Sequence, residues 1–259
     1  STSRRQRQMC IRDRTMRLNF LGCGSGFTDS HNNAFFTTEE NDIVFIDLSM
    51  LNIRKALKLI NGKKDVYLLI THMHDDHVSG LTLFIQYLYY TLGNRILNIV
   101  IPEVLYIDVV DELRIKGISP YLYKILVYNP VLNQFVHPWD SVSWLNKIIP
   151  TEHVPELAGR CFGYDLNVLD THIIYTGDTC RLSDFTPYLE EEGSEFYVDC
   201  SYDYGAVHLK WSDVECDLKE LAMKHKVYLM HLDNQRAFQL VDLHGIHLVR
   251  EYIGFTKEV

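Results

Sequence analysis

Short hydrophobic runs alternate with stretches of helical period along most of the chain. The runs are continuous rather than interleaved with polar residues, which is typical of strands buried on both faces of a sheet. We expect strands at 17–21, 34–38, 43–47, 66–70, 97–101, 161–166, 172–176, 195–199 and 227–231, and a last short strand at 246–250. We expect helices at about 50–60, 81–92, 103–116, 212–225 and 234–242. Strands and helices mixed in this way predict a layered α/β fold.

Length and composition fit one globular domain. The chain has 259 residues, of which 47% are hydrophobic and 23% are charged. The longest apolar helix, expected at 81–92, is interrupted by Thr82 and Gln86 and is too short to cross a bilayer. We therefore predict no membrane span. Because this helix is apolar nearly all round, it is buried in its own domain or against a second copy.

The cysteines indicate a reducing compartment. Their spacing shows no short pairs, and the sequence shows no secretory signal. We therefore expect reduced thiols in a cytoplasmic protein. The six residues are Cys10, Cys23, Cys161, Cys180, Cys200 and Cys216.

The first fourteen residues differ from the rest in composition. They hold five arginines against one aspartate, a net charge of +4, and have no hydrophobic period. They are either a basic arm for nucleic acid or a non-native extension. We favour the extension, because "QMCIRDR" looks like a translated adaptor joined in frame. The domain is then 15–259, and removing +4 from the total of −9 leaves it a net charge of −13.

Residue types that bind metal follow several of the predicted strands. The strand at 66–70 leads into "THMHDDH", His153 follows "IIPTE", Asp178 comes after "HIIYTG", and His231 closes "VYLM". Because open α/β sheets gather their sites at the carboxyl ends of strands, we expect these side chains to converge. The candidate ligands are His72, His74, Asp76, His77, His153, Asp178 and His231.

Seven nitrogen and oxygen donors exceed what one ion takes but suit two. Zn²⁺ binds imidazole nitrogens and carboxylate oxygens at about 2.0–2.2 Å, and a shared carboxylate can hold two ions about 3.5–4 Å apart. We expect two divalent metal ions. Zinc is the first choice, with Mn and Fe as alternatives, because such donor sets accept all three.

These motifs carry a resemblance to a known superfamily. "THMHDDH" matches the HxHxDH signature of the metallo-β-lactamase superfamily, and the later histidines and aspartate resemble its downstream motifs in order. The resemblance implies a four-layer αββα sandwich. It also implies that Asp47 supports the metal loop and that Asp178 bridges two metals. One metal is then held by His72, His74 and His153, and the other by Asp76, His77 and His231.

Two further segments are similar to the ribonuclease Z-like phosphodiesterases. "LNFLGCGSGF" resembles their start, and "FYVDCSYDYGAVHLK" resembles the segment that holds their general acid. The resemblance implies that Asp199 orients His208 and that His208 protonates the leaving group, which an alkoxide requires at neutral pH. The alternative for His208 is a histidine satisfied by a backbone carbonyl. Asp76 is also a candidate to accept a proton from the attacking water.

The expected substrate is a small phosphodiester rather than tRNA. The protruding basic arm of ribonuclease Z is not visible here, and a net charge of −13 opposes a polyanion. The last motif reads "MHLDN", where ribonuclease Z usually has Ser or Thr. The overall pattern resembles the phage anti-Pycsar cyclic-nucleotide phosphodiesterases, so we expect a cyclic nucleotide. Alternatives are tRNA 3′ processing, lactone or thioester hydrolysis, and nucleotide binding without catalysis.

Three more features have two interpretations each. The glycine loop at 22–26 either lets the backbone approach substrate or forms a turn. Asn32 and Asn33 are expected in a turn rather than at the substrate. The aromatic residues of the irregular segment 121–144 pack against the body, which we favour, or form a lid or a dimer contact. The ribonuclease Z resemblance implies a homodimer.

Overall fold

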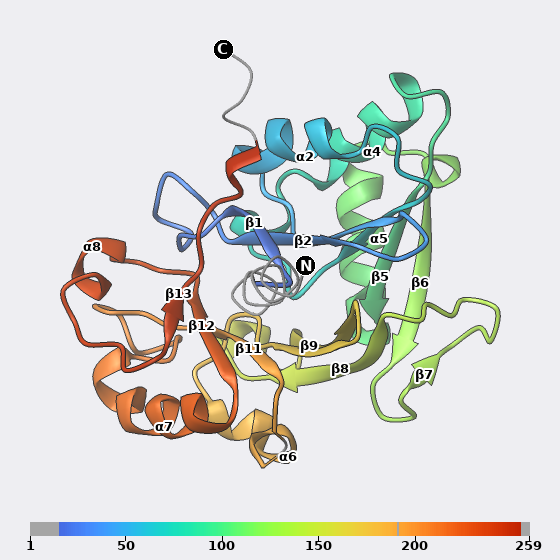
Figure 1. Ribbon diagram of the computed structural model, residues 1–259. Helices are drawn as coiled ribbons and strands as arrows, with labels where there is room; N and C mark the ends of the chain where they lie inside the picture. Colours follow the sequence, from blue (N-terminus) through green and yellow to red (C-terminus); the bar gives the residue numbers. More distant parts are fainter. Residues whose placement is uncertain (1–15, 191, 255–259) are drawn as a thin grey trace, which may run out of the picture.

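Two β-sheets pack face to face, with helices on the outside of both (Figure 1). The structure is a computed structural model that describes residues 16–190 and 192–254. The N-terminal half of the chain builds one sheet and the C-terminal half builds the other. The expected αββα sandwich is confirmed. The proposed non-native extension at 1–14 lies outside the described residues.

The first sheet has the strand order β1-β2-β3-β4-β5-β6-β7. Its strands are β1 (Asn19–Gly22), β2 (Asn33–Thr37), β3 (Ile43–Ile46), β4 (Val66–Leu69), β5 (Leu97–Pro102), β6 (Tyr123–Asn129) and β7 (Gln134–Phe135). Strands β3 to β6 are parallel, so their carboxyl ends share one edge of the sheet.

The second sheet has the strand order β13-β12-β11-β10-β9-β8. Its strands are β8 (Leu145–Thr151), β9 (Cys161–Val168), β10 (Thr171–Tyr175), β11 (Glu195–Asp199), β12 (Lys226–Met230) and β13 (His247–Leu248). Strands β10 to β13 are parallel. Because β9 is antiparallel to both β8 and β10, β8 points the same way as β10.

Helices form the two outer layers. The first sheet is covered by α2 (Ile53–Leu59), α4 (Leu81–Tyr90) and α5 (Tyr106–Ile115), and the second by α6 (Thr186–Leu189) and α7 (Trp211–Lys224) (Figure 1). The short helices α3 (Asp75–Val78) and α8 (Gln235–Phe238) follow β4 and β12. Short 3₁₀ helices lie at Met50–Asn52, Glu103–Leu105, Pro120–Leu122, Pro155–Leu157 and Leu182–Phe185.

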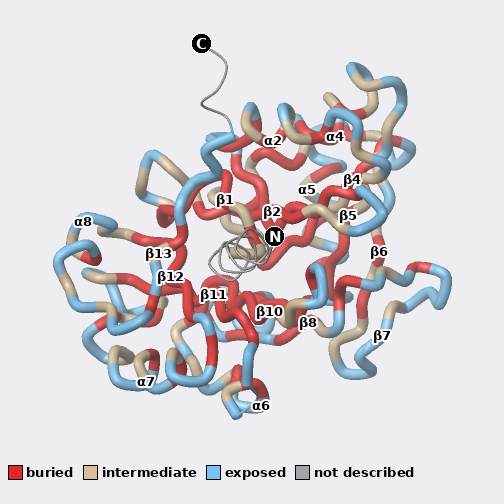
Figure 2. The backbone as a smooth tube through the Cα atoms, viewed as in Figure 1, coloured by how far each residue is buried: buried red, intermediate tan, exposed pale blue. Residues whose placement is uncertain are grey.

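Two hydrophobic clusters hold the layers together, and the buried parts of the chain follow the strands (Figure 2). In the larger cluster the rings of Phe20 and Tyr197 join the two sheets, with centroids 5.7 Å apart. Phe84 of α4 packs edge-on against Phe45, at 5.5 Å. The smaller cluster packs α6 and α7 on the second sheet. Among the described residues, no helix combines the length and the apolar character needed to cross a membrane.

The segment 121–144, expected to be irregular, instead contains β6 and β7. The expectation was wrong: the run from Ile125 to Tyr128 is apolar, and it pairs with β5 as a strand along which burial alternates. The aromatic residues differ in burial, with Tyr123 and Phe135 partly buried against the core. Tyr128 and Trp144 are buried, as expected, whereas Tyr121 and Trp139 are 84% and 75% exposed.

Candidate metal centre

The polar run after β4 lies at the centre of the site. β4 is paired on both sides and its chain continues buried to Ile70. The backbone then leaves the sheet, and α3 follows with Asp75 and Asp76 in its first turn, where a helix favours carboxylates. Asp75 is exposed, while the preceding His72 and the later His77 are buried.

The candidate ligands from both sheets meet here in two groups. One atom from each of His72, His74 and His153 lies within 4.8 Å of the others, and the same holds for Asp76, His77, Asp178 and His231. These are the two sets that the motifs predicted, with Asp178 in the second set. His153, Asp178 and His231 follow the carboxyl ends of β8, β10 and β12 in the second sheet. The other candidates follow the carboxyl end of β4 in the first sheet, on the turn into α3 or in α3 itself.

Asp178 lies between the two groups. Its Oδ2 atom is 3.3 Å from Nε2 of His77 and 3.3 Å from Nε2 of His231. It is also 3.9 Å from Nε2 of His72 and 3.8 Å from Nε2 of His153. Burial acts to raise the pKa of Asp178, but the neighbouring histidines outweigh it and hold the pKa well below its usual range. An ionised carboxylate in this position can bridge two cations.

The outer nitrogens of two histidines are fixed by oxygens that only accept hydrogen bonds. Nδ1 of His153 lies 2.7 Å from the carbonyl oxygen of Val207, and Nδ1 of His77 lies 2.7 Å from Oδ2 of Asp47. Each Nδ1 therefore carries a proton, which leaves Nε2 as the nitrogen that a metal ion would bind. This is the tautomer that a metal ligand requires.

Asp47 supports the segment from the end of β4 into α3, which carries four candidate ligands, at two points. Besides His77, its carboxylate accepts hydrogen bonds from the backbone N–H and the hydroxyl of Thr71, each at 2.8 Å. Asp47 is fully buried and has a φ of 59° just after β3, a conformation that Asp tolerates better than most residues. Burial raises the pKa of its carboxyl, and the hydrogen bonds from His77 and Thr71 act in the opposite direction.

Asp199 and His208 form the expected pair. Nδ1 of His208 donates to Oδ2 of Asp199 over 2.8 Å, so the carbonyl-bonded alternative is not what the structure shows. Burial acts to lower the pKa of His208, but the Asp199 charge and hydrogen bond outweigh it and raise the pKa. Oδ1 of Asp199 also lies 3.4 Å from Nδ1 of His231. One carboxylate thus holds the candidate acid and lies beside a candidate ligand.

Asn33 has a role that sequence reasoning missed. It begins β2 rather than lying in a turn, and it is fully buried. Its amide donates to the carbonyl oxygen of Asp76 at 3.1 Å and accepts from the N–H of Ser49 and from Asn52. Asn33 therefore ties the start of α3 to the segment after β3. The signal was hidden, because its partner Asp76 is 43 positions away.

A cavity of about 640 Å³ opens over the centre. Its lining includes His74, Asp76, His153, Asp178 and His231 together with His208. Phe27, Tyr204, Ala206 and Val207 also line it. A cavity of this volume accommodates a small organic ligand.

The donor set fits divalent cations. Nε2 of His77 and Oδ1 of Asp178 are buried and have no hydrogen-bond partner among the described residues, although buried polar atoms normally have one. Nε2 of His72 and Nδ1 of His74 lie only 2.9 Å apart. Burial acts to lower the pKa of His231, but the carboxylates outweigh it and raise the pKa to about 10. These features are those of a site that balances its charge with cations.

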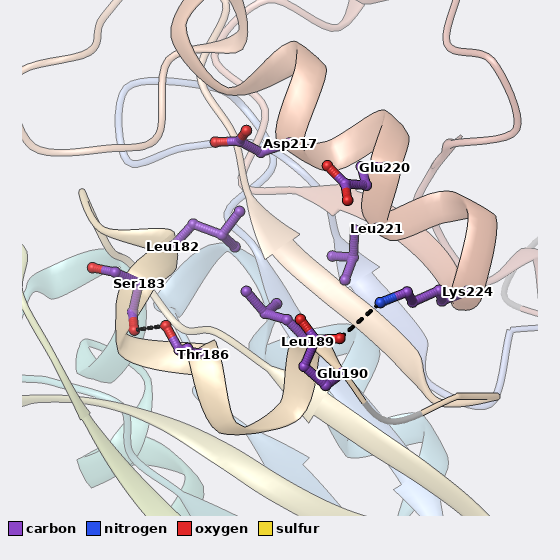
Figure 3. A pocket seen from close by; sticks show the side chains of 9 residues that line it. All are labelled: Leu182, Ser183, Thr186, Leu189, Glu190, Asp217, Glu220, Leu221 and Lys224. Atoms are coloured by element: carbon purple, nitrogen blue, oxygen red, sulfur yellow. Dashed lines mark hydrogen bonds and ion pairs between the residues drawn. The ribbon is translucent and has the colours of Figure 1, made fainter.

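A second cavity, of about 330 Å³, lies on the outside of the second sheet between α6 and α7 (Figure 3). Its walls carry Asp217, Glu220 and an ion pair of 2.9 Å between Lys224 and Glu190. No histidine or cysteine is among its described lining residues. The candidate metal ligands therefore line the first cavity and not this one.

Comparison with known folds agrees with this geometry. The metallo-β-lactamase fold protein YhfI from Bacillus subtilis superposes with a TM-score of 0.70 at 16% identity, covering 90% of this chain and 95% of that one. Zn²⁺-bound PqqB from Methylobacterium extorquens superposes with a TM-score of 0.68 at 11% identity, covering 91% and 98%. At such identities the likeness concerns the fold.

Sequence comparison identifies the family. The anti-Pycsar protein Apyc1 of Bacillus phage 010DV004 is 24% identical over 244 residues, covering 86% of this chain and 92% of that protein. The family profile described as Anti-Pycsar protein Apyc1 matches residues 16–252. The resemblance predicted from the motifs is confirmed, and with it the expectation of a metal-dependent hydrolase of the phosphodiesterase type. The chain belongs to the Anti-Pycsar protein Apyc1 family.

Proposed function

We propose that this protein hydrolyses small phosphodiesters, cyclic nucleotides in the first place, with two divalent cations. The observation that carries the proposal is the pairing of the two ligand groups around Asp178 with the Asp199–His208 pair beside them. His72, His74 and His153 would hold one ion, Asp76, His77 and His231 the other, and Asp178 both. When bound, the cations supply a hydroxide nucleophile and stabilise charge on the phosphoryl oxygens.

His208 protonates the leaving oxygen, a step for which the cations offer no proton. Its Nδ1 is occupied by Asp199, so a proton on Nε2 is the one available to the leaving oxygen. The ring centroid of His208 lies 4.8 Å from that of His153 and 4.8 Å from that of His231, which places it beside both ligand groups. Such a positioned acid contributes about 10²- to 10⁴-fold in rate when the leaving group is an alkoxide.

The size and charge of the molecule favour a small substrate. The cavity of about 640 Å³ holds a mononucleotide, and the acidic body offers little to a polyanion. A small phosphodiester needs only the local site.

The decisive experiment separates attack on the phosphorus atom from protonation of the leaving group. The full chain, loaded with Zn²⁺ or Mn²⁺, is assayed on a panel of 3′,5′- and 2′,3′-cyclic nucleotides and on a p-nitrophenyl phosphodiester, whose leaving group needs no proton. We expect His208→Ala to slow cyclic-nucleotide hydrolysis about 10²-fold or more and to leave the p-nitrophenyl ester nearly unaffected. Equal losses on both substrates would refute the role of His208.

A matched control is available in the same chain. His172 also pairs with a carboxylate, with Nε2 lying 2.9 Å from Oδ1 of Asp165, but it does not line the cavity. His172→Ala should therefore leave both rates unchanged. Absence of turnover of every cyclic nucleotide by protein shown to hold two ions would overturn the proposed substrate, and precursor tRNA and lactones would be assayed next.

We also propose a homodimer. The helix at 81–90 is buried along one face, whereas Leu83 and Tyr90 on α4 are 40% and 71% exposed. Light scattering of the full chain tests this. A monomer at assay concentration would refute the proposed dimer and would leave the proposed hydrolysis unaffected.

A further inference from the structure

Two aromatic side chains on the rim of the cavity have no role in the proposed hydrolysis. Phe27 is fully exposed and Tyr204 is 70% exposed, and both line the cavity above the metal centre. Leaving a phenylalanine entirely in water forgoes the stabilisation of burying it, about 1.5–3 kcal/mol. An exposed aromatic ring at the mouth of a binding cavity therefore indicates a partner that covers it.

The loop that carries Phe27 is held firmly. The N–H and the hydroxyl of Thr28 both donate to the carbonyl oxygen of Ser25, at 3.0 and 2.8 Å. Ser25 N–H donates to the carbonyl of Leu232 at 3.2 Å, and Leu232 N–H donates back to Cys23 at 2.9 Å. The ring of Phe27 thus projects from an ordered loop.

The loop that carries Tyr204 is held by Asp233, the residue that follows Leu232. The carboxylate of Asp233 accepts hydrogen bonds from the hydroxyl of Ser201 and from the N–H groups of Tyr202, Asp203 and Tyr204, over 2.6, 2.7, 2.8 and 3.3 Å. Leu232 and Asp233 therefore anchor the two rim loops from adjacent positions. This assigns a role to the aspartate in "MHLDN", where the ribonuclease Z pattern differs.

The two loops border different halves of the metal centre. Gly26 lies against Asp76, so closely that a Cβ at Gly26 would be 3.0 Å from Oδ2 of Asp76. The Tyr204 loop continues to Val207, whose carbonyl accepts from His153. A phosphodiester at the centre is consequently flanked by Phe27 on the Asp76 side and by Tyr204 on the His153 side.

We propose that Phe27 and Tyr204 are the base-binding residues of this enzyme, contacting the faces of the purine or pyrimidine attached to the phosphodiester, and that Asp233 is the positioning residue of Tyr204. The inference rests on the proposed function and adds to it how the base is held. Every nucleobase presents two π-faces, and stacking on an aromatic side chain is a general mode of base binding. The aromatic walls bind the base, while the cations bind the phosphate.

The test compares two substrates that differ only in the base. One is 3′,5′-cyclic AMP and the other is the methyl riboside 3′,5′-cyclic phosphate, which has no base. For Phe27→Ala and Tyr204→Ala we expect KM for cyclic AMP to rise about 5- to 100-fold, with kcat within about twofold, because the stack is equal in ground and transition states. KM for the abasic compound should stay within about twofold. Phe27→Tyr should restore the parent KM, whereas Phe27→Leu should not.

Tyr106→Ala is the matched control, because Tyr106 is 41% exposed and lies outside the cavity. Its kinetics should equal those of the parent. Asp233→Asn should raise KM for cyclic AMP in the same way as Tyr204→Ala, with the content of bound metal unchanged. A fall in metal content or in abasic turnover would show that Asp233 supports the metal centre instead, which would overturn its positioning role.

These outcomes test the proposed base-binding subsite, formed by Phe27 and Tyr204, separately from the proposed hydrolysis. Equal changes of KM for both substrates, or a parent that hydrolyses the abasic compound as efficiently as cyclic AMP, would overturn the subsite while leaving the phosphodiesterase intact. If the parent hydrolyses neither, the proposed function fails. Calorimetric binding of 5′-AMP then still judges the subsite: weaker binding in both alanine variants supports it, and unchanged binding overturns it.

Discussion

The dependence of the metal centre on a residue outside it can be measured with Asp47→Asn. Asp47 touches no proposed ion, yet its two carboxylate oxygens receive three hydrogen bonds. Oδ1 accepts from Thr71 N–H, and Oδ2 accepts from the Thr71 hydroxyl and from Nδ1 of His77. Asparagine is nearly the same size but has only one acceptor oxygen. Its NH₂ group must face a donor on one side.

The size of the effect follows from these contacts. At least one fully buried hydrogen bond is lost and two donors confront each other, which costs about 1–3 kcal/mol. Loss of an outer partner of a ligating histidine typically weakens metal binding about 10- to 100-fold, or about 1.4–2.8 kcal/mol. The two estimates agree. We expect the larger loss at the ion bound by His77, and a smaller one at the other ion, because Thr71 also contacts His72 at 3.0 Å.

The assay is competition between metal-free full chain and a chromophoric zinc chelator, which gives a dissociation constant for each ion. Asp42→Asn is the matched control. Asp42 is also buried and precedes β3, as Asp47 follows it. Among the described residues its carboxylate accepts one hydrogen bond, from the N–H of Asp65 at 3.1 Å. Asp42→Asn should alter stability slightly and metal affinity not at all.

Two results would refute the reasoning. If Asp47→Asn binds both ions within about twofold of the parent, the orientation of His77 does not depend on this carboxylate. If Asp42→Asn loses as much affinity as Asp47→Asn, the effect reflects general stability rather than the contacts of the metal loop.

Three other predictions follow from single contacts. Gly26→Ala places a methyl group 3.0 Å from Oδ2 of Asp76, so we expect about tenfold weaker binding of one ion, measured with the same chelator. Removing the cations with EDTA should lower the melting temperature by roughly 5–10 °C, and Zn²⁺ should restore it in a thermal melt. Burial acts to raise the pKa of Glu251, but the bonds from Lys55 and Ser30 outweigh it and lower the pKa. Its stabilising contribution is therefore present above the unfolded pKa of about 4.3 and is lost as pH falls through the lower folded pKa. The melting temperatures of the parent and Glu251→Gln should accordingly converge between pH 6 and pH 3.5; a constant gap would contradict this.

The sequence predicts the central strands and the grouping of candidate ligands for one physical reason. Strands such as β4 and β11 are buried along their centres, which are continuously apolar, and the polar residue that ends or follows each marks the rim. β6 and β7 lie outside this rule. β6 pairs with the two-residue β7 and is only half buried. Its apolar run, from Ile125 to Tyr128, is bounded by Lys124 and Asn129, and Pro120 and Pro130 punctuate the segment around it.

The supporting contacts could not be read from the sequence. Asn33 and Asp233 reach partners 43 and 31 positions away, and no local spacing encodes such a distance. Each residue type also has a common alternative, since Asn and Asp favour turns whatever they bond. Only the fold shows that Asn33 holds α3 and that Asp233 holds the Tyr204 loop. Motifs specify which atoms bind a ligand, and tertiary contacts specify how firmly.

The acidic body and an anionic substrate are compatible because of distance. Beyond residue 14 the chain carries a net charge of −13, yet Asp47, Asp76, Asp178 and Asp199 at the site would balance the charge of the two proposed divalent cations. A single phosphate arriving there would meet a locally neutral or positive field, and charges farther than about 8–10 Å away are largely screened at physiological ionic strength. A tRNA extends over many such lengths and meets the acidic surface along most of them. The same charge distribution that admits a small phosphodiester therefore disfavours a long one.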